Sequence, residues 1–274
     1  MLTSLVVELK AAEAVSLPAN LGRAGQALLL RLIAEQDADL AAQLHAGDSL
    51  RPLTASNLVM GRRAEGSLHL AAGQSGWLRF TGLTAAVSGC LTRLAEGPPQ
   101  SVELDRVHLA VTGATLDPAA HPWAGQISYQ DLAGRYLLGG QAPPPYLTLE
   151  FASPTTFRSG GKFLPLPLPE LVFGSLLDRW QTFSPVALNP ETRRFAAEAV
   201  ALSRYRLRTR GMPYKRGGGG GNTLIGFSGQ VAFRALNRDR YWLNVLHLLG
   251  AFAFYSGVGA QTGSGLGQTR LYGE

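Results

Sequence analysis

The chain has 274 residues, of which 46% are hydrophobic and 16% are charged, a balance that excludes a disordered protein and is typical of a folded globular one. Its single cysteine, Cys90, excludes an internal disulfide and a zinc site built from several cysteines. The longest apolar stretch, 245–255, is too short to span a bilayer, and the N-terminus lacks the basic segment of a signal peptide. We therefore expect a cytoplasmic protein with no membrane partner.

The formal net charge is +6, and the positive charge is concentrated in the second half of the chain. Residues 1–149 carry 10 Lys and Arg against 12 Asp and Glu, whereas residues 150–274 carry 15 against 7. Of the 25 basic residues, 22 are arginine, which suits bidentate phosphate contacts and base stacking, although a GC-rich genome would also raise the arginine share. The uneven charge favours a polyanionic partner.

The first half of the chain predicts a ferredoxin-like unit, in which two helices connect four strands in the order β-α-β-β-α-β. The assignment rests on the apolar periodicity of each segment. In chain order we expect a strand over 3–10, helices over 21–35 and 37–44, extended chain over 51–60, one or two strands over 66–80, a helix over 83–95 and a strand over 101–113.

The second half predicts the same order again, after a stretch rich in proline and glycine over 117–145. Its expected elements are strands over 146–152, 200–210, 223–236 and 266–272, and helices over 166–182, after Pro190 and over 239–255. The predicted fold is therefore α+β, with two tandem ferredoxin-like, RRM-like domains and a C-terminal glycine-rich loop. We place an N-terminal domain at 1–120, a linker at 121–145 and a C-terminal domain at 146–274.

The loop before the last strand is almost free of large side chains. It holds two Gly-x-Gly units, Gly257 with Gly259 and Gly265 with Gly267. Glycine reaches positive φ angles and lets another group approach the backbone, so exposed N–H groups here could hold a phosphate. The simpler alternative is a tight turn. The loop lacks a nucleotide-binding fingerprint, and we expect a nucleic acid to lie against its N–H groups.

The segment 203–210 is the clearest electrostatic signal, because arginine occupies every second position. In a strand the four arginines would share one face and repel one another, a cost that an anionic ligand relieves. A solvated polar face is the alternative, but no acid interleaves with the arginines, which favours nucleic-acid binding. A loop that is glycine-rich over 217–221 follows and could close over the ligand. The predicted contacts are Arg204, Arg206, Arg208, Arg210, Lys215 and Arg216, whereas Tyr205, Leu207 and Thr209 are expected to face a core.

His45 is the candidate for acid–base chemistry. It lies at a predicted helix end, close to Gly47 and to the basic residue Arg51. An imidazole moves protons near neutral pH and an arginine stabilises a developing phosphorane charge, which are the two roles that RNA cleavage through its 2′-hydroxyl requires. The alternative is an inert surface histidine. The other histidines are set aside, because His69, His108 and His247 have apolar neighbours and His121 lies in the expected linker.

The sequence offers no pattern typical of a metal site. Its acidic residues are scattered, and the motifs His-x-Glu and Cys-x-x-Cys and a serine nucleophile elbow are missing. We therefore expect no metal and no other cofactor, so nuclease chemistry would have to proceed without one.

Several stretches resemble known CRISPR proteins. The glycine loop at 257–267 resembles the signature of the RAMP superfamily. In the second half, LEFASPTTF at 149–157, LPLP at 164–167, LLDRW at 176–180, GFSGQVAFR at 226–234 and GAFAFYSG at 250–257 are similar to the second domain of the CRISPR-associated endoribonucleases, the sixth Cas family. In the first half the weaker match is Leu44-His45 followed by RPLTAS at 51–56.

The resemblance implies metal-independent cleavage of CRISPR precursor RNA within its repeats. The route would be attack by a 2′-hydroxyl on the adjacent phosphate, leaving a 5′-hydroxyl and a 2′,3′-cyclic phosphate or 3′-phosphate. His45 matches the family's general acid/base, and Arg51 falls where a basic residue stabilises the transition state. Many members add a tyrosine from the first domain, but no tyrosine precedes Tyr129 in this chain.

The partner that the resemblance implies is CRISPR repeat RNA, and other CRISPR effector subunits and a homodimer are further candidates. The predicted RNA contacts also include Arg158 and Lys162. The alternative function is a non-catalytic RAMP subunit that binds guide RNA inside an effector complex.

Overall fold

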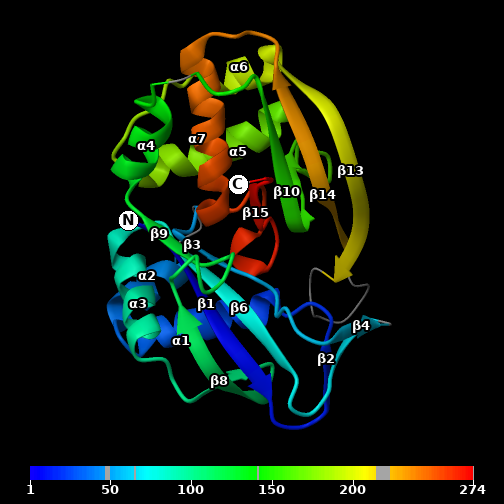
Figure 1. The fold of residues 1–274 in the computed structure, drawn as a ribbon. Helices are drawn as coiled ribbons and strands as arrows, with labels where there is room; N and C mark the ends of the chain where they lie inside the picture. The colour runs from blue at the N-terminus through cyan, green and yellow to red at the C-terminus, as the bar shows by residue number, and fades with distance from the viewer. Residues whose placement is uncertain (47–49, 65, 141, 214–222, 274) are drawn as a thin grey trace. The chain divides into compact units, whose positions relative to one another are not determined.

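The protein is described here by a computed structural model, which covers residues 1–46, 50–64, 66–140, 142–213 and 223–273. The chain forms two compact units (Figure 1). Unit 1 comprises Met1–Ile127 and Gly263–Gly265, and unit 2 comprises Ser128–Thr262 and Leu266–Glu274.

Unit 1 has the element order of a ferredoxin-like fold, which confirms the fold class predicted for the first half. Its basic elements are β1 (Leu2–Ala11), α1 (Gly22–Ala34), β3 (Leu53–Ala55), β6 (Ser75–Gly82), α3 (Ala85–Glu96) and β8 (Val107–Thr115). The sheet runs β3-β6-β1-β8, so the first strand lies in the middle and pairs antiparallel with β6 and β8. The buried leucines of α1 recur at helical spacing and pack with α3 on one face of this sheet.

Unit 1 also has elements beyond the basic order. They are α2 (Ala38–Ala46), β7 (Ser101–Leu104), β9 (Gly125–Ile127) and a separate sheet of β2 (Val15–Pro18), β5 (Ser67–Leu70) and β4 (Arg62–Ala64). The strand expected over 101–113 is a hairpin of β7 and β8, because Asp105 and Arg106 turn the chain with φ angles of 49° and 71°. Positive φ at both central residues is the geometry of a tight hairpin turn.

The second face of the unit 1 sheet, opposite the helices, is covered by the segment that contains Trp123. Arg79 of β6 is only 2% exposed there. Its Nε donates to Ser4 Oγ at 2.7 Å and to Trp123 O at 3.2 Å, and its guanidinium carbon lies 4.8 Å from the centre of the Trp123 ring. This arginine is held by neutral acceptors and an aromatic ring inside the unit.

Unit 2 repeats the ferredoxin-like order. Its basic elements are β10 (Tyr146–Thr155), α5 (Pro169–Phe183), β13 (Val200–Pro213), β14 (Thr223–Ala235), α7 (Arg240–Ser256) and β15 (Thr269–Leu271). The sheet order is β13-β14-β10-β15, the same arrangement as in unit 1, with β13 at one edge. The additional elements are α4 (Tyr129–Leu137), β11 (Phe157–Ser159), β12 (Lys162–Leu164), α6 (Thr192–Ala199) and the short helix η1 (Thr262–Ser264).

The stretch 121–145, expected to be a linker, contains β9 and α4, so it is not simply loop. Ser128 begins α4, because its side chain accepts from the backbone N–H of Asp131. The helix buries Tyr129, which forms edge-to-face contacts with Trp180 of α5 and lies 6.0 Å from the ring of Phe252. Apolar side chains therefore hold this segment against the helices of unit 2.

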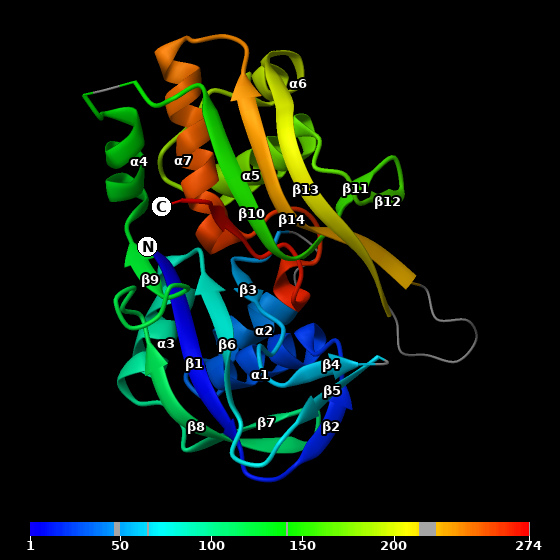
Figure 2. The ribbon, with the colours of Figure 1, turned by 45° about the vertical axis from the view of Figure 1, so that its right-hand side comes forward.

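The helices α5 and α7 cover one face of the unit 2 sheet (Figure 2). Phe173 of α5 meets Phe233 of β14 edge to face, with ring centres 5.2 Å apart, and both rings are buried. Phe151 and Phe227 pack in the same layer at 4.9 Å. Of the other described helices, α4 packs against α7 and α6 packs against α5, so the opposite face of this sheet carries no described helix of the unit.

Within the described chain, every helix falls short of the length and apolar character needed to cross a membrane.

Candidate functional site

The arginines of β13 share one face of the unit 2 sheet, as their alternation predicted. Leu202 pairs with Phe233 and Arg204 with Ala232, so Ser203 between them is an extra residue that forms a β-bulge. Phe233 faces the helices, and a one-residue bulge exchanges the faces of the residues that follow it. The four arginines therefore lie on the helix-free face, with Arg204 opposite Ala232, Arg206 opposite Gln230, Arg208 opposite Ser228 and Arg210 opposite Gly226.

These four guanidinium groups are exposed and form no hydrogen bond or ion pair with any described residue. Alternate residues of a strand are about 6.6 Å apart, at which two charges repel by roughly 0.6 kcal/mol in water. On the same face Arg234 is exposed, and Arg270 pairs with Glu150 at 2.7 Å. We call this surface the arginine face, made of Arg204, Arg206, Arg208, Arg210, Arg234 and Arg270.

The residues that alternate with the arginines do not all face a core, contrary to the prediction. Tyr205 is 67% exposed and Thr209 is also exposed, whereas Leu207 is half-buried. The reason is the edge position of β13, which has a neighbouring strand on one side only. An edge strand leaves both faces partly in solvent.

Two further predicted RNA contacts lie on a hairpin. β11 and β12 pair antiparallel, and Gly160 and Gly161 connect them with φ angles of 55° and 75°. Arg158 and Lys162 are exposed on this hairpin, and the Arg158 guanidinium lies 6.0 Å from the ring centre of Phe163. Both charges are accessible to a ligand. The predicted contacts Lys215 and Arg216 lie outside the described residues.

The glycine loop requires glycine for its own conformation. Gly257, Gly259, Gly265 and Gly267 have φ angles of 62°, 82°, 88° and 70°. A Cβ atom at Gly259 would come within 2.4 Å of Thr156 O, and one at Gly267 within 2.2 Å of Val258 O. The nearest neighbours of Gly259 and Gly267 are backbone atoms of the protein, and that of Gly265 is the Asn57 side chain, so the loop is a packed turn.

The N–H groups of these four glycines are engaged within the protein, contrary to the expectation that they would face a nucleic acid. Gly257 donates to Ala253 O, Gly259 to Ser175 Oγ, Gly265 to Ala55 O and Gly267 to Pro154 O, at distances of 2.9–3.2 Å. A backbone amide that already donates offers no hydrogen bond to a phosphate. These four glycines therefore determine the conformation of the loop, and their N–H groups do not form an anion-binding site.

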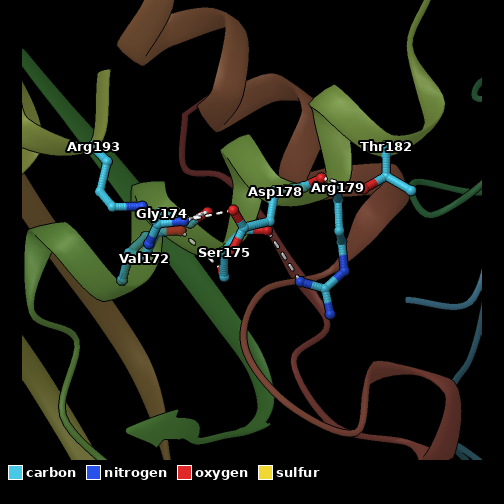
Figure 3. A network of polar contacts seen from close by, with 7 residues as sticks. All are labelled: Val172, Gly174, Ser175, Asp178, Arg179, Thr182 and Arg193. Carbon is cyan, nitrogen blue, oxygen red and sulfur yellow. Dashed lines mark hydrogen bonds and ion pairs between the residues drawn. The ribbon is translucent and has the colours of Figure 1, made fainter. Parts of the chain in front are cut away.

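Helix α5 holds one end of this loop through a buried arginine (Figure 3). Arg179 donates Nη2 to Gly259 O at 2.7 Å and to Thr262 Oγ1 at 3.2 Å. Its burial lowers the pKa to about 10, while the adjacent Asp178 acts in the opposite direction. Asp178 itself pairs with Arg193 of α6 at 2.5 Å. No local pattern predicts this role, because Arg179 is one of many arginines in the second half.

His45 lies in the last turn of α2 and is exposed, while the preceding Leu44 is buried and anchors the helix. The imidazole forms no hydrogen bond, ion pair or ring contact with any described residue. Arg51 is half-buried, just before β3. Both candidate catalytic residues therefore belong to unit 1, on either side of residues 47–49, which lie outside the described chain.

Apolar neighbours are a poor reason to set a histidine aside. His69 and His108 are exposed, because strand alternation turns His69 away from the buried Leu68 and Leu70 and turns His108 away from the buried Leu109. His121 Nδ1 accepts from the Trp123 N–H at 3.1 Å, and burial lowers its pKa. His247 is buried, with Nε2 2.9 Å from Pro144 O. Three histidines of unit 1 are therefore exposed: His45, His69 and His108.

Across the described residues, no three side chains of His, Cys, Asp or Glu come together in a group that could hold a metal ion.

Two family models match the chain and together cover most of it. The CRISPR Cas6 N-terminal domain matches residues 1–134, and the CRISPR-associated endoribonuclease Cas6 matches residues 149–269. A curated relative, the CRISPR-associated endoribonuclease Cas6 of Streptococcus thermophilus, is 25% identical over 151 residues. That match covers 53% of this chain and 60% of the relative, which is less than two thirds of the relative's length.

Solved Cas6 structures match the whole chain. A Cas6 product complex superimposes with a TM-score of 0.78 at 28% identity, covering 99% of both chains. A Cas6 of Thermus thermophilus matches with a TM-score of 0.71 at 26% identity, covering 99% of this chain and 98% of that one. A protein from a Cas6-related gene of Pyrococcus furiosus shares the fold at 12% identity, with a TM-score of 0.62 and complete coverage of both chains.

Proposed function

This chain belongs to the Cas6 family of CRISPR-associated endoribonucleases, and we propose that it cleaves CRISPR precursor RNA within the repeats to give guide RNA. The observation that carries the proposal is the exposed, unpartnered imidazole of His45 in a chain matched along both halves by Cas6 models. Related Cas6 proteins have been solved with product and with a substrate mimic, and one as a histidine-to-alanine mutant.

The proposed reaction is an internal transesterification that needs no metal. His45 takes the proton of a ribose 2′-hydroxyl, whose oxygen attacks the adjacent phosphorus, or it returns a proton to the departing 5′-oxygen. The bond from phosphorus to the 5′-oxygen breaks, which leaves a 5′-hydroxyl and a 2′,3′-cyclic phosphate that water can open. Arg51 stabilises the additional negative charge of the transition state. No tyrosine precedes Tyr129, so a group other than a first-domain tyrosine completes the set.

Binding of the RNA is assigned to the basic surface of unit 2. The arginine face offers exposed guanidinium groups, and Arg158 and Lys162 extend the positive charge onto the β11–β12 hairpin. Arginines contact phosphates whatever the nucleotide sequence, so this surface contributes to RNA affinity and not to sequence specificity. That affinity falls as the salt concentration rises.

The first test is cleavage of end-labelled repeat RNA by the purified protein in EDTA, where a single cut is expected. His45→Ala should lower the cleavage rate by roughly 10²–10⁴-fold with little change in RNA affinity, since only proton transfer is removed. The matched controls are His69→Ala and His108→Ala, which remove exposed histidines elsewhere in unit 1 and should cleave normally.

Each result has a distinct meaning. A cut that requires Mg²⁺ would overturn the metal-independent mechanism, and full activity of His45→Ala would overturn the role of that residue. Tight RNA binding without any cut, in EDTA or in Mg²⁺, would instead identify the alternative function, a non-catalytic RAMP subunit.

A further inference from the structure

Two exposed tyrosines lie on the helix-free face of unit 2, and the proposed cleavage reaction does not use them. Tyr146 of β10 is 60% exposed, and Tyr272, which follows β15, is 56% exposed. Neither ring has a hydrogen bond, ring contact or cation contact with a described residue. Large aromatic side chains left this open on a sheet are candidates for contact with a ligand.

The strand pairing places both tyrosines beside the arginine face. Tyr146 lies directly opposite Arg234 of β14. The backbone N–H of Tyr272 donates to Thr148 O at 2.9 Å, and Thr148 pairs with Ala232, which pairs in turn with Arg204. One row across the sheet thus runs from Tyr272 to Arg204, and the residues between them are small.

The spacing suits an extended chain laid over the sheet. Tyr146 and Thr148 are alternate residues of β10, so the two tyrosines are diagonal neighbours, about 7–8 Å apart at the backbone. Strands are spaced by about 4.8 Å, so Tyr272 stands three spacings, roughly 14 Å, from β13, and Tyr146 of β10 stands two spacings, roughly 10 Å, from it. Aromatic rings therefore occupy one side of the face and unpaired guanidinium groups occupy the other.

The charge of this face selects an anionic ligand. Glu150 is the one acidic side chain among its described positions, and it is paired with Arg270. The remaining arginines have no acidic partner among the described residues. An anion with flat apolar groups at regular intervals would satisfy both halves of the surface.

We propose that this face binds unpaired nucleotides of the RNA, with bases stacked on Tyr146 and Tyr272 and phosphates on Arg234 and the β13 arginines. The inference rests on the proposed function and adds the part of the substrate that this surface takes. A base offers a ring face to a tyrosine only when it is unpaired, because in a duplex both of its faces are already stacked. Single-stranded RNA is therefore the occupant.

The test compares binding of two labelled RNAs to the full chain by fluorescence anisotropy: an unpaired RNA of about ten nucleotides and a blunt-ended hairpin. Tyr146→Leu and Tyr272→Leu should each weaken binding of the unpaired RNA by roughly 10-fold and leave hairpin binding within about twofold. Tyr146→Phe and Tyr272→Phe keep the stacking ring and should bind like the unmodified chain.

The matched control is Tyr205→Leu, which removes an equally exposed tyrosine from the other face of the same sheet and should change nothing. If the leucine variants bind unpaired RNA normally while the unmodified chain binds and cuts repeat RNA, this inference is wrong and the proposed function stands. If the unmodified chain binds neither RNA, both proposals are wrong.

Discussion

The two ferredoxin-like units share one strand order but use the helix-free face of the sheet in opposite ways. In unit 1 this face is covered, and Arg79 is buried between Ser4 Oγ, the carbonyl oxygen of Trp123 and its ring. In unit 2 the face carries exposed arginines without described partners. The same side chain thus stabilises one unit and is available to a ligand in the other. What differs is whether the chain itself supplies acceptors.

The largest expected effect is a loss of stability on replacing Arg79 by alanine, which tests whether the covered face of unit 1 differs from the open face of unit 2. The substitution removes a buried side chain and its hydrogen bonds, so the free energy of unfolding should fall by about 3 kcal/mol in urea denaturation. Arg62→Ala, at an exposed position of the same unit, should change it by less than about 0.5 kcal/mol. If Arg79→Ala lowers the free energy of unfolding as little as Arg62→Ala does, the buried contacts of Arg79 make no net contribution to stability.

The converse change is the triple replacement of Arg204, Arg206 and Arg208 by glutamine. Stability should hardly change, because these exposed side chains form no hydrogen bond or ion pair with a described residue. RNA affinity should fall by about 10- to 100-fold, and the slope of log K against log salt should flatten by about 2, as expected for three lost phosphate contacts on single-stranded RNA. If the RNA affinity of the variant at low salt is unchanged, the β13 arginines do not belong to the RNA-binding surface.

The smallest expected effect is that of removing the acidic side chain from the arginine face. Glu150→Gln removes the one acid of the face and releases Arg270 from its ion pair. The pair is partly exposed, so its loss should cost less than about 1 kcal/mol of stability. RNA affinity should rise by about two- to threefold at low salt and converge with that of the unmodified chain at high salt. Weaker binding would show that Glu150 orients Arg270 for its ligand.

Much of the fold follows from apolar periodicity, and the exceptions have local causes. Over 101–113 the apolar residues alternate at even-numbered positions first, at Val102 and Leu104, and then at odd-numbered positions, at Val107 and Leu109. This shift in the alternation results from the turn at Asp105 and Arg106. Helix α4 was missed because proline and glycine flank it on both sides. Alternation alone grouped the β13 arginines correctly.

The candidate site was less predictable, because it depends on tertiary neighbours. The bulge at Ser203 decides which face the arginines take, and nothing in the local sequence marks it. The glycine loop seemed available to a ligand, but its amides donate to Ser175, Pro154 and other residues far along the chain. The roles of Arg79 and Arg179 required the folded structure, because burial does not follow from composition.

The edge position of β13 has a consequence for how copies of the protein meet. A long edge strand presents unpaired backbone groups, on which the edge of a second molecule could add. On this edge two copies would bring two rows of arginines together, and like charges placed across a strand pair oppose the pairing. The arginines would thus also oppose edge-to-edge association of free molecules in dilute salt. Bound RNA or concentrated salt would weaken that repulsion, so the same charges would govern both ligand binding and self-association.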